Sequence, residues 1–175
     1  STRLSAQCTD ARVNLVTPEL FSKFPSLHAL ADAPIEEIEE IIKPCGLFHT
    51  KARDIKMLSR MLIDDFGGEL PNTLEDLIKL PGIGRKTANL VMGDIFHQPA
   101  VVTDTHCIRI CGRLGLTKEK EPFKVEMELK KILPPEKSND FCHRLVHFGR
   151  EFCKARGPQC TACPLRDICK NVEVK

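Results

Sequence analysis

The stretch Leu80-Pro81-Gly82-Ile83-Gly84-Arg85-Lys86-Thr87-Ala88-Asn89 decides the fold of this 175-residue chain. Before it, Thr73 caps a short run of apolar residues at helical spacing. After it, a second helical pattern continues to about Phe96. Two helices joined by a short turn that contains two glycines form a helix-hairpin-helix. We predict this motif over about residues 73–96.

The rest of the chain is predicted to be helical too, because apolar residues recur at three- and four-residue spacing. One apolar stripe follows Pro34, and another is stopped by Gly67-Gly68. Both are expected to face the core, and they comprise Ile35, Ile38, Ile41 and Ile42, and Ile55, Leu58, Leu62 and Phe66.

The C-terminal half continues the helical pattern. Asp104 or Thr103 caps a helix that ends at Leu114-Gly115, and Pro122 opens the next one. The last helix is marked by Phe141, Leu145, Phe148 and Phe152. Only residues 100–103 look extended, and they are too few to found a sheet. The predicted fold class is therefore all-α.

The composition and the first residues of the chain indicate a globular, soluble protein of the cytoplasm. The chain is 42% hydrophobic and 29% charged, with no apolar run near the roughly 20 residues that cross a bilayer. Its first residues do not resemble a secretion signal. We expect a globular, soluble protein of the cytoplasm, associated with the nucleoid if bacterial. The boundary between its two lobes is expected at Gln98-Pro99, which gives lobes of residues 1–98 and 99–175.

The hairpin is a candidate anion site. Gly82 and Gly84 leave room for another backbone, and the following helix start presents free N–H groups around Ile83. Such a site holds a nucleic-acid phosphate without reading a base. The alternative is a tight turn between packed helices with Ile83 in the core. The net charge of +2 does not decide between them.

Lys86 is the candidate nucleophile. It lies in the first turn of the second hairpin helix, where the helix dipole favours the neutral amine. A solvated surface lysine is the alternative. Asp104 is the candidate partner, because its carboxylate could stabilise a developing sugar cation. A plain N-cap is the alternative for Asp104, and the two roles are compatible.

Four of the nine cysteines form a candidate metal site: Cys153, Cys160, Cys163 and Cys169. Only Cys160 and Cys163 have the short spacing of a zinc knuckle, so we favour a [4Fe–4S] cluster over zinc within the loop of residues 153–169. Lys154 and Arg156 lie between the first two ligands, in a basic loop that could hold a DNA backbone.

These motifs together resemble the endonuclease III family of bifunctional DNA glycosylases, in the helix-hairpin-helix superfamily. The resemblance covers essentially the whole chain. It includes the hairpin stretch, the four cysteines, Leu4-Ser5-Ala6-Gln7, Gly46-Leu47-Phe48 and Val102-Thr103-Asp104-Thr105-His106. Related adenine glycosylases lack a lysine at the position of Lys86 and only remove the base.

The resemblance implies a six-helix barrel lobe, a cluster lobe and a base-excision repair reaction. Lys86 would displace the base at the sugar C1′ to form a Schiff base, with help from Asp104, and β-elimination would then nick the strand. The expected partner is double-stranded DNA with oxidised or ring-saturated pyrimidines or abasic sites. A monomer without membrane contact is expected.

The resemblance also assigns DNA contacts. Gln7 would fill the gap left by the flipped nucleotide, Leu47 would wedge into the stack, and His106 would contact DNA. Leu47 as a core residue is the alternative. Family members usually have a further N-terminal stretch, so we expect that part to be missing here. Two other hypotheses stay open: a non-catalytic DNA-binding module, and a zinc-stapled helical protein without a repair role.

Overall fold

The computed structural model describes residues 2–170, and these contain nine α-helices, five short 3-10 helices and no strand. The prediction of an all-α fold is confirmed. The chain divides into two compact units, Ser1–Ala88 and Asn89–Lys175, and the division falls inside one helix of the hairpin.

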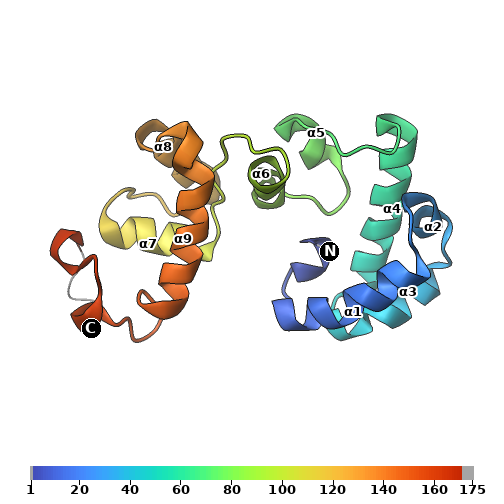
Figure 1. Ribbon diagram of the computed structural model, residues 1–175, viewed down its shortest axis with the longest axis horizontal. Helices are drawn as coiled ribbons and strands as arrows, with labels where there is room; N and C mark the ends of the chain where they lie inside the picture. The colour runs from blue at the N-terminus through green and yellow to red at the C-terminus, as the bar shows by residue number, and fades with distance from the viewer. Residues whose placement is uncertain (1, 171–175) are drawn as a thin grey trace. The chain divides into compact units, whose positions relative to one another are not determined.

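The first unit is built around one long helix, α4 (Phe48–Phe66). Helices α2 and α3 pack on α4, and α1 packs on α3 (Figure 1). The other elements of this unit are η1 (Thr2–Ser5), α1 (Asp10–Lys23), α2 (Leu27–Asp32), α3 (Ile35–Ile42), η2 (Lys43–Cys45) and α5 (Leu74–Lys79).

The two predicted apolar stripes of this unit, on α3 and on α4, differ in how far their side chains are buried. Three members of the α3 stripe are fully buried: Ile38, Ile41 and Ile42. On α4 only Leu62 is buried, and the other three members of that stripe are half-buried. Helices α1 and α4 both pack on α3 and cover its stripe.

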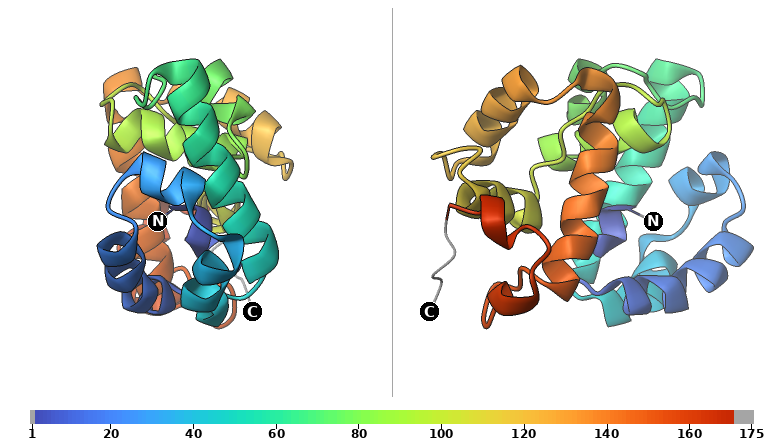
Figure 2. Two further views of the ribbon diagram at one scale, coloured as in Figure 1. Left: turned by 90° about the vertical axis from the view of Figure 1, so that its right-hand side faces the viewer. Right: turned by 60° about the vertical axis from the view of Figure 1, so that its left-hand side comes forward.

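The second unit holds helices α7, α8 and α9, with α7 packed on α9 (Figure 2). Its elements are α6 (Arg85–Asp94, which begins in the first unit), α7 (Thr105–Leu114), α8 (Pro122–Ile132), η3 (Pro135–Lys137), α9 (Ser138–Glu151), η4 (Cys160–Ala162) and η5 (Arg166–Ile168). Residues 100–103 are buried but form no strand. Their core neighbours include Ile110, Val125, Leu129, Cys142 and Leu145.

Local signals place the helix ends as predicted. Thr73 Oγ1 accepts a hydrogen bond of 3.2 Å from the Asp76 amide and caps α5. Asp104, rather than Thr103, caps α7, and Gly115 ends that helix in the left-handed conformation with φ +77°. Within residues 2–170, no helix is both long and apolar enough to cross a membrane.

Candidate functional site

The hairpin turn packs at Gly82 against Arg3 and Asp54, two residues of the same unit. Gly82 has φ +73°, and a Cβ on it would lie 2.3 Å from Arg3 Nε and 2.8 Å from Asp54 Oδ2. Arg3 and Asp54 form an ion pair, with 2.7 Å between Nε and Oδ2. Gly82 is therefore required twice, once by its backbone conformation and once by the side chains packed against it.

The other glycine of the turn faces open space. No protein atom lies within 4 Å of the position that a Cβ on Gly84 would take. The Ala88 amide donates to the Gly84 carbonyl at 2.9 Å, so α6 begins here and its first amides point out of the helix start. Ile83 is half-buried and exposes part of its side chain beside this opening.

Lys86 is the second residue of α6 and its side chain is exposed. Among the described residues, nothing hydrogen-bonds or ion-pairs with its amine. The amine is accessible to a ligand as a result, and it lies in the same helix turn as the open amides next to Gly84.

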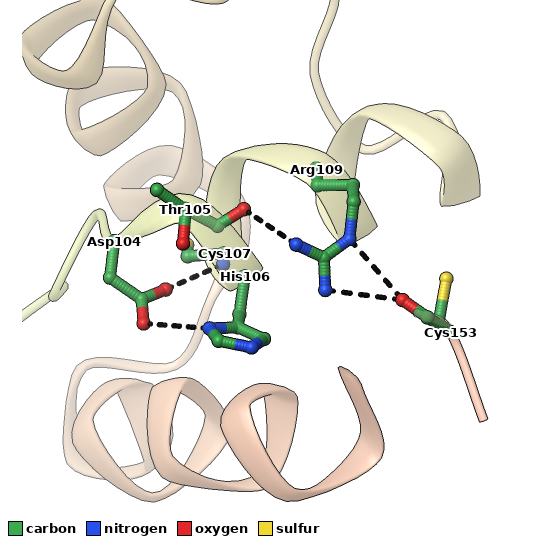
Figure 3. Close-up of polar contacts among 6 residues, drawn as sticks. All are labelled: Asp104, Thr105, His106, Cys107, Arg109 and Cys153. Atoms are coloured by element: carbon green, nitrogen blue, oxygen red, sulfur yellow. Dashed lines mark hydrogen bonds and ion pairs between the residues drawn. The ribbon is translucent and has the colours of Figure 1, made fainter. Parts of the chain in front are cut away.

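Asp104 lies at the start of α7 with 19% of its side chain exposed. One carboxylate oxygen accepts a hydrogen bond of 2.7 Å from the Cys107 amide, and the other lies 3.2 Å from His106 Nδ1 (Figure 3). The contacts hold the carboxylate in one orientation at the helix N-terminus, so the N-cap role of Asp104 is confirmed.

The opposite side of α7 is tied to the cysteine segment. The Arg109 guanidinium donates to the Cys153 carbonyl from Nε at 3.2 Å and from a terminal nitrogen at 3.1 Å (Figure 3). Helix α9 approaches closely because Gly149 has no side chain, since a Cβ there would lie 2.6 Å from the His106 ring. One helix thus carries both Asp104 and an anchor for Cys153.

The four predicted metal-binding cysteines line one cavity. Its apolar walls include Ile110, Leu114, Phe148 and Phe152. Arg113 donates to Cys153 Sγ at 3.3 Å and to the Lys154 and Ala155 carbonyls at 2.8 and 3.2 Å. Arg113 therefore orders the start of the loop, while the Lys154 and Arg156 side chains are exposed on it.

The four cysteines supply a donor set that an iron–sulfur cluster can use. Each cysteine of such a cluster binds its own iron atom, so four thiolates around one cavity are enough to hold a [4Fe–4S] group.

The two residues expected to insert into DNA share a rare backbone conformation. Gln7 and Leu47 have φ of +52° and +49°, and the third described non-glycine residue with positive φ is His97. Leu47 is 57% exposed, so the alternative that it is a core residue is wrong. Side chains held outward by a strained backbone are typical of functional positions.

Two buried cysteines outside the candidate metal site, Cys107 and Cys142, have raised pKa values. A hydrogen bond with Cys111 and burial raise the pKa of Cys107 above its usual range. A hydrogen bond with Cys107 and burial raise the pKa of Cys142 further still. The raised pKa values favour the protonated thiols at neutral pH, the less nucleophilic form.

Sequence reasoning missed the residues that hold the site in place. Arg109 and Arg113 lie one helical turn apart on α7, which is a detectable signal, but their targets are 44 and 40 residues away. The Arg3–Asp54 pair under the hairpin spans 51 residues and has no local signature. Lys51, fully buried in α4, looks like any surface lysine in the sequence.

Residues 1–135 match the HhH-GPD superfamily of base excision DNA repair proteins, and the chain belongs to this family. Among curated proteins, it is similar to Endonuclease III of Bacillus subtilis, with 46% identity over 95% of this chain and 77% of the relative. Endonuclease III of Escherichia coli is 38% identical over 97% of this chain and 81% of the relative.

Solved structures agree with this assignment. A non-covalent Endonuclease III–DNA complex matches with a TM-score of 0.91 and 46% identity, covering 98% of this chain and 80% of that chain. A trapped Endonuclease III–DNA covalent intermediate matches with the same TM-score and identity, over 98% and 81% of the two chains. The resemblance drawn from the motifs is confirmed.

Proposed function

We propose that this chain is a base-excision repair DNA glycosylase with AP lyase activity that removes oxidised or ring-saturated pyrimidines through Lys86. The observation that carries the proposal is the exposed Lys86 amine in the first turn of α6, beside the open face of Gly84. A similar protein has been trapped covalently on DNA, which supports a covalent intermediate here as well.

The reaction begins at the sugar of a flipped nucleotide. The neutral amine of Lys86 attacks C1′, and the base leaves with the electrons of the glycosidic bond and gains a proton. The Asp104 carboxylate stabilises the positive charge that develops on the sugar. Its fixed orientation, set by the Cys107 amide and His106, lowers the cost of reorganising the site during this step.

The second half of the reaction breaks the strand. The sugar ring opens to a Schiff base between Lys86 and C1′, which makes a C2′ proton acidic. Loss of that proton drives β-elimination, in which the bond from C3′ to its phosphate oxygen breaks. Hydrolysis of the imine then frees Lys86, so the enzyme is regenerated without any external oxidant.

DNA is held by contacts that do not read sequence. We assign phosphate binding to the amides around Gly82, Ile83 and Gly84, where the positive end of the α6 dipole attracts an anion. In the second unit, Lys154 and Arg156 add positive charge on the exposed loop and His106 supplies a further contact. Gln7 fills the gap left by the flipped nucleotide, and Leu47 wedges into the base stack.

A [4Fe–4S] cluster held by Cys153, Cys160, Cys163 and Cys169 orders the C-terminal loop in this proposal. The cluster cross-links residues that otherwise form only short 3-10 turns, η4 and η5. Its contribution to DNA binding is indirect, through the shape of the basic loop. Metal analysis of the purified chain should find about four iron atoms and no zinc.

We place the protein in the cytoplasm, on the nucleoid in a bacterial cell, acting as a monomer on double-stranded DNA. Borohydride reduction in the presence of an abasic duplex tests the central step. The chain should form a covalent adduct, Lys86→Ala should form none, and Lys79→Ala, which changes a lysine paired with Asp76 on α5, should behave like the unchanged protein. Binding to the duplex without any adduct would instead support a non-catalytic DNA-binding module.

A further inference from the structure

Lys51 is a fully buried lysine that the reaction above does not use. It lies in α4, and its ammonium donates to the Leu4 carbonyl and to the Cys45 carbonyl, each at 2.9 Å. Among the described residues it has no carboxylate partner. Burying an ammonium group is unfavourable unless hydrogen bonds replace its water, so these two carbonyls are its main compensation.

The two carbonyls belong to the segments that carry the inserting side chains. Leu4 lies three residues before Gln7, at the end of η1, and Cys45 lies two residues before Leu47, at the end of η2. The backbone amide of Lys51 also donates a hydrogen bond of 3.0 Å to the Leu47 carbonyl, in the first turn of α4. One residue is therefore bonded to both segments, which are otherwise about forty positions apart in sequence.

A second contact joins the same two segments. The Cys8 thiol, next to Gln7, lies near the buried Cys45 thiol: burial raises the pKa of Cys45, and the neighbouring Cys8 thiol raises it further. Both inserting residues have left-handed backbones, which non-glycine residues rarely adopt without support from their surroundings. The two hydrogen bonds from the Lys51 ammonium supply such support in both segments, because they fix the chain three residues before Gln7 and two residues before Leu47.

We propose that Lys51 is a positioning residue that sets the backbone of both segments and thereby fixes Gln7 and Leu47 relative to each other for insertion into damaged DNA. The inference rests on the proposed function of those two side chains. A lysine suits this task because three donors at one point can reach carbonyls from two chain segments. Methionine has nearly the same length and no donor.

The matched control lies on the same helix. Lys56 also donates its ammonium to a backbone carbonyl, that of Ala33, but this segment carries no inserting residue. Lys51→Met and Lys56→Met therefore each remove a lysine-to-carbonyl contact from α4. They differ in whether the contact leads to Gln7 and Leu47.

The test measures the affinity of the full chain for a duplex with a central tetrahydrofuran abasic analogue and for the same duplex undamaged. Lys51→Met should lower the ratio of the two affinities by about tenfold, the size expected from losing one stacked side chain. Lys56→Met should leave the ratio within about twofold. Borohydride trapping on single-stranded abasic DNA, which has no stack to fill, should persist in Lys51→Met.

A mutant cycle separates positioning from a merely structural role. If Lys51 acts through the two inserting residues, the ratio for Lys51→Met combined with Gln7→Ala and Leu47→Ala should be no lower than for Gln7→Ala with Leu47→Ala alone. Additive losses, or an unchanged ratio in Lys51→Met, would overturn the inference. If Lys51→Met does not fold, Lys51→Leu, which also has no donor, replaces it with the same expected result, and Lys51→Arg, which keeps the donors, should recover part of the ratio.

Failure of the underlying function gives a different pattern. If the unchanged chain shows no preference for the abasic duplex, the roles assigned to Gln7 and Leu47 are wrong and the inference falls with them. If the unchanged chain shows the preference and Lys51→Met shows it equally, only the role of Lys51 is wrong.

Discussion

Substitution of Asp104 separates its structural role from its proposed chemical role. Asparagine keeps an oxygen that accepts the Cys107 amide, now at 2.7 Å from the carboxylate, and so keeps the cap of α7. Alanine removes both the acceptor and the charge. We expect Asp104→Asn to be nearly as stable as the unchanged protein, whereas both variants lose the glycosylase reaction.

The sizes of these effects follow from the contacts. Loss of an N-cap acceptor costs about 1 kcal/mol, and loss of a negative charge at a helix start costs about 0.5 kcal/mol. For a protein of this length, Asp104→Ala should lower the melting temperature by about 3–6 °C and Asp104→Asn by about 1–2 °C. The rate of base removal should fall by about 10²–10³ in both variants, as when one transition-state stabilising group is lost.

The assay combines thermal unfolding by circular dichroism with single-turnover release of thymine glycol from a duplex. Thr73→Ala is the matched control, because Thr73 caps α5 through an equivalent hydrogen bond of 3.2 Å to the Asp76 amide. It should lose about 1 kcal/mol of stability and keep its rate of base removal. An Asp104→Asn variant that removes the base at the normal rate would refute the role of the carboxylate charge.

Three further predictions concern two glycines and a pair of buried thiols. Gly82→Ala should lower the free energy of unfolding by about 2 kcal/mol in a denaturant titration. The reason is that the φ of +73° disfavours a side chain and that a Cβ would lie against the Arg3–Asp54 pair. A Cβ at Gly84 meets open space, so Gly84→Ala should change the free energy of unfolding by less than about 1 kcal/mol. It should weaken DNA binding in an anisotropy titration, because the Cβ would stand where the phosphate approaches. Normal binding would contradict a phosphate site there. A hydrogen bond with Cys111 and burial raise the pKa of Cys107, and a hydrogen bond with Cys107 and burial raise that of Cys142. Both thiols should therefore resist iodoacetamide at pH 7–8 in the native protein and react only after unfolding, with modification read by mass spectrometry.

Patterns local in the sequence were sufficient for the helices and for the candidate residues. The caps at Thr73 and Asp104 and the stop at Gly67 depend on neighbours within one helical turn, so they can be recognised without knowing the fold. The spacing of the four cysteines likewise indicated that they would surround one site, and they line one cavity.

The depth of burial could not be read in the same way. The stripe on α4 repeats as regularly as the one on α3, yet only Leu62 of its four members is buried. Periodicity tells which face of a helix is apolar, but the amount of cover on that face depends on which other helices pack there. The deeper burial of α3 is a property of the assembled unit.

The sequence by itself determined the helical class, the hairpin and the residue types available for chemistry, because these depend on interactions between near neighbours. Only the tertiary structure decided that Lys51 is buried beneath the Gln7 and Leu47 segments, that Gly82 packs on the Arg3–Asp54 pair and that Arg113 orders the cysteine loop. The Lys51–Leu4, Arg3–Asp54 and Arg113–Cys153 hydrogen bonds join residues 47, 51 and 40 positions apart. Their partners are brought together by the packing of whole helices, and no local pattern records that packing.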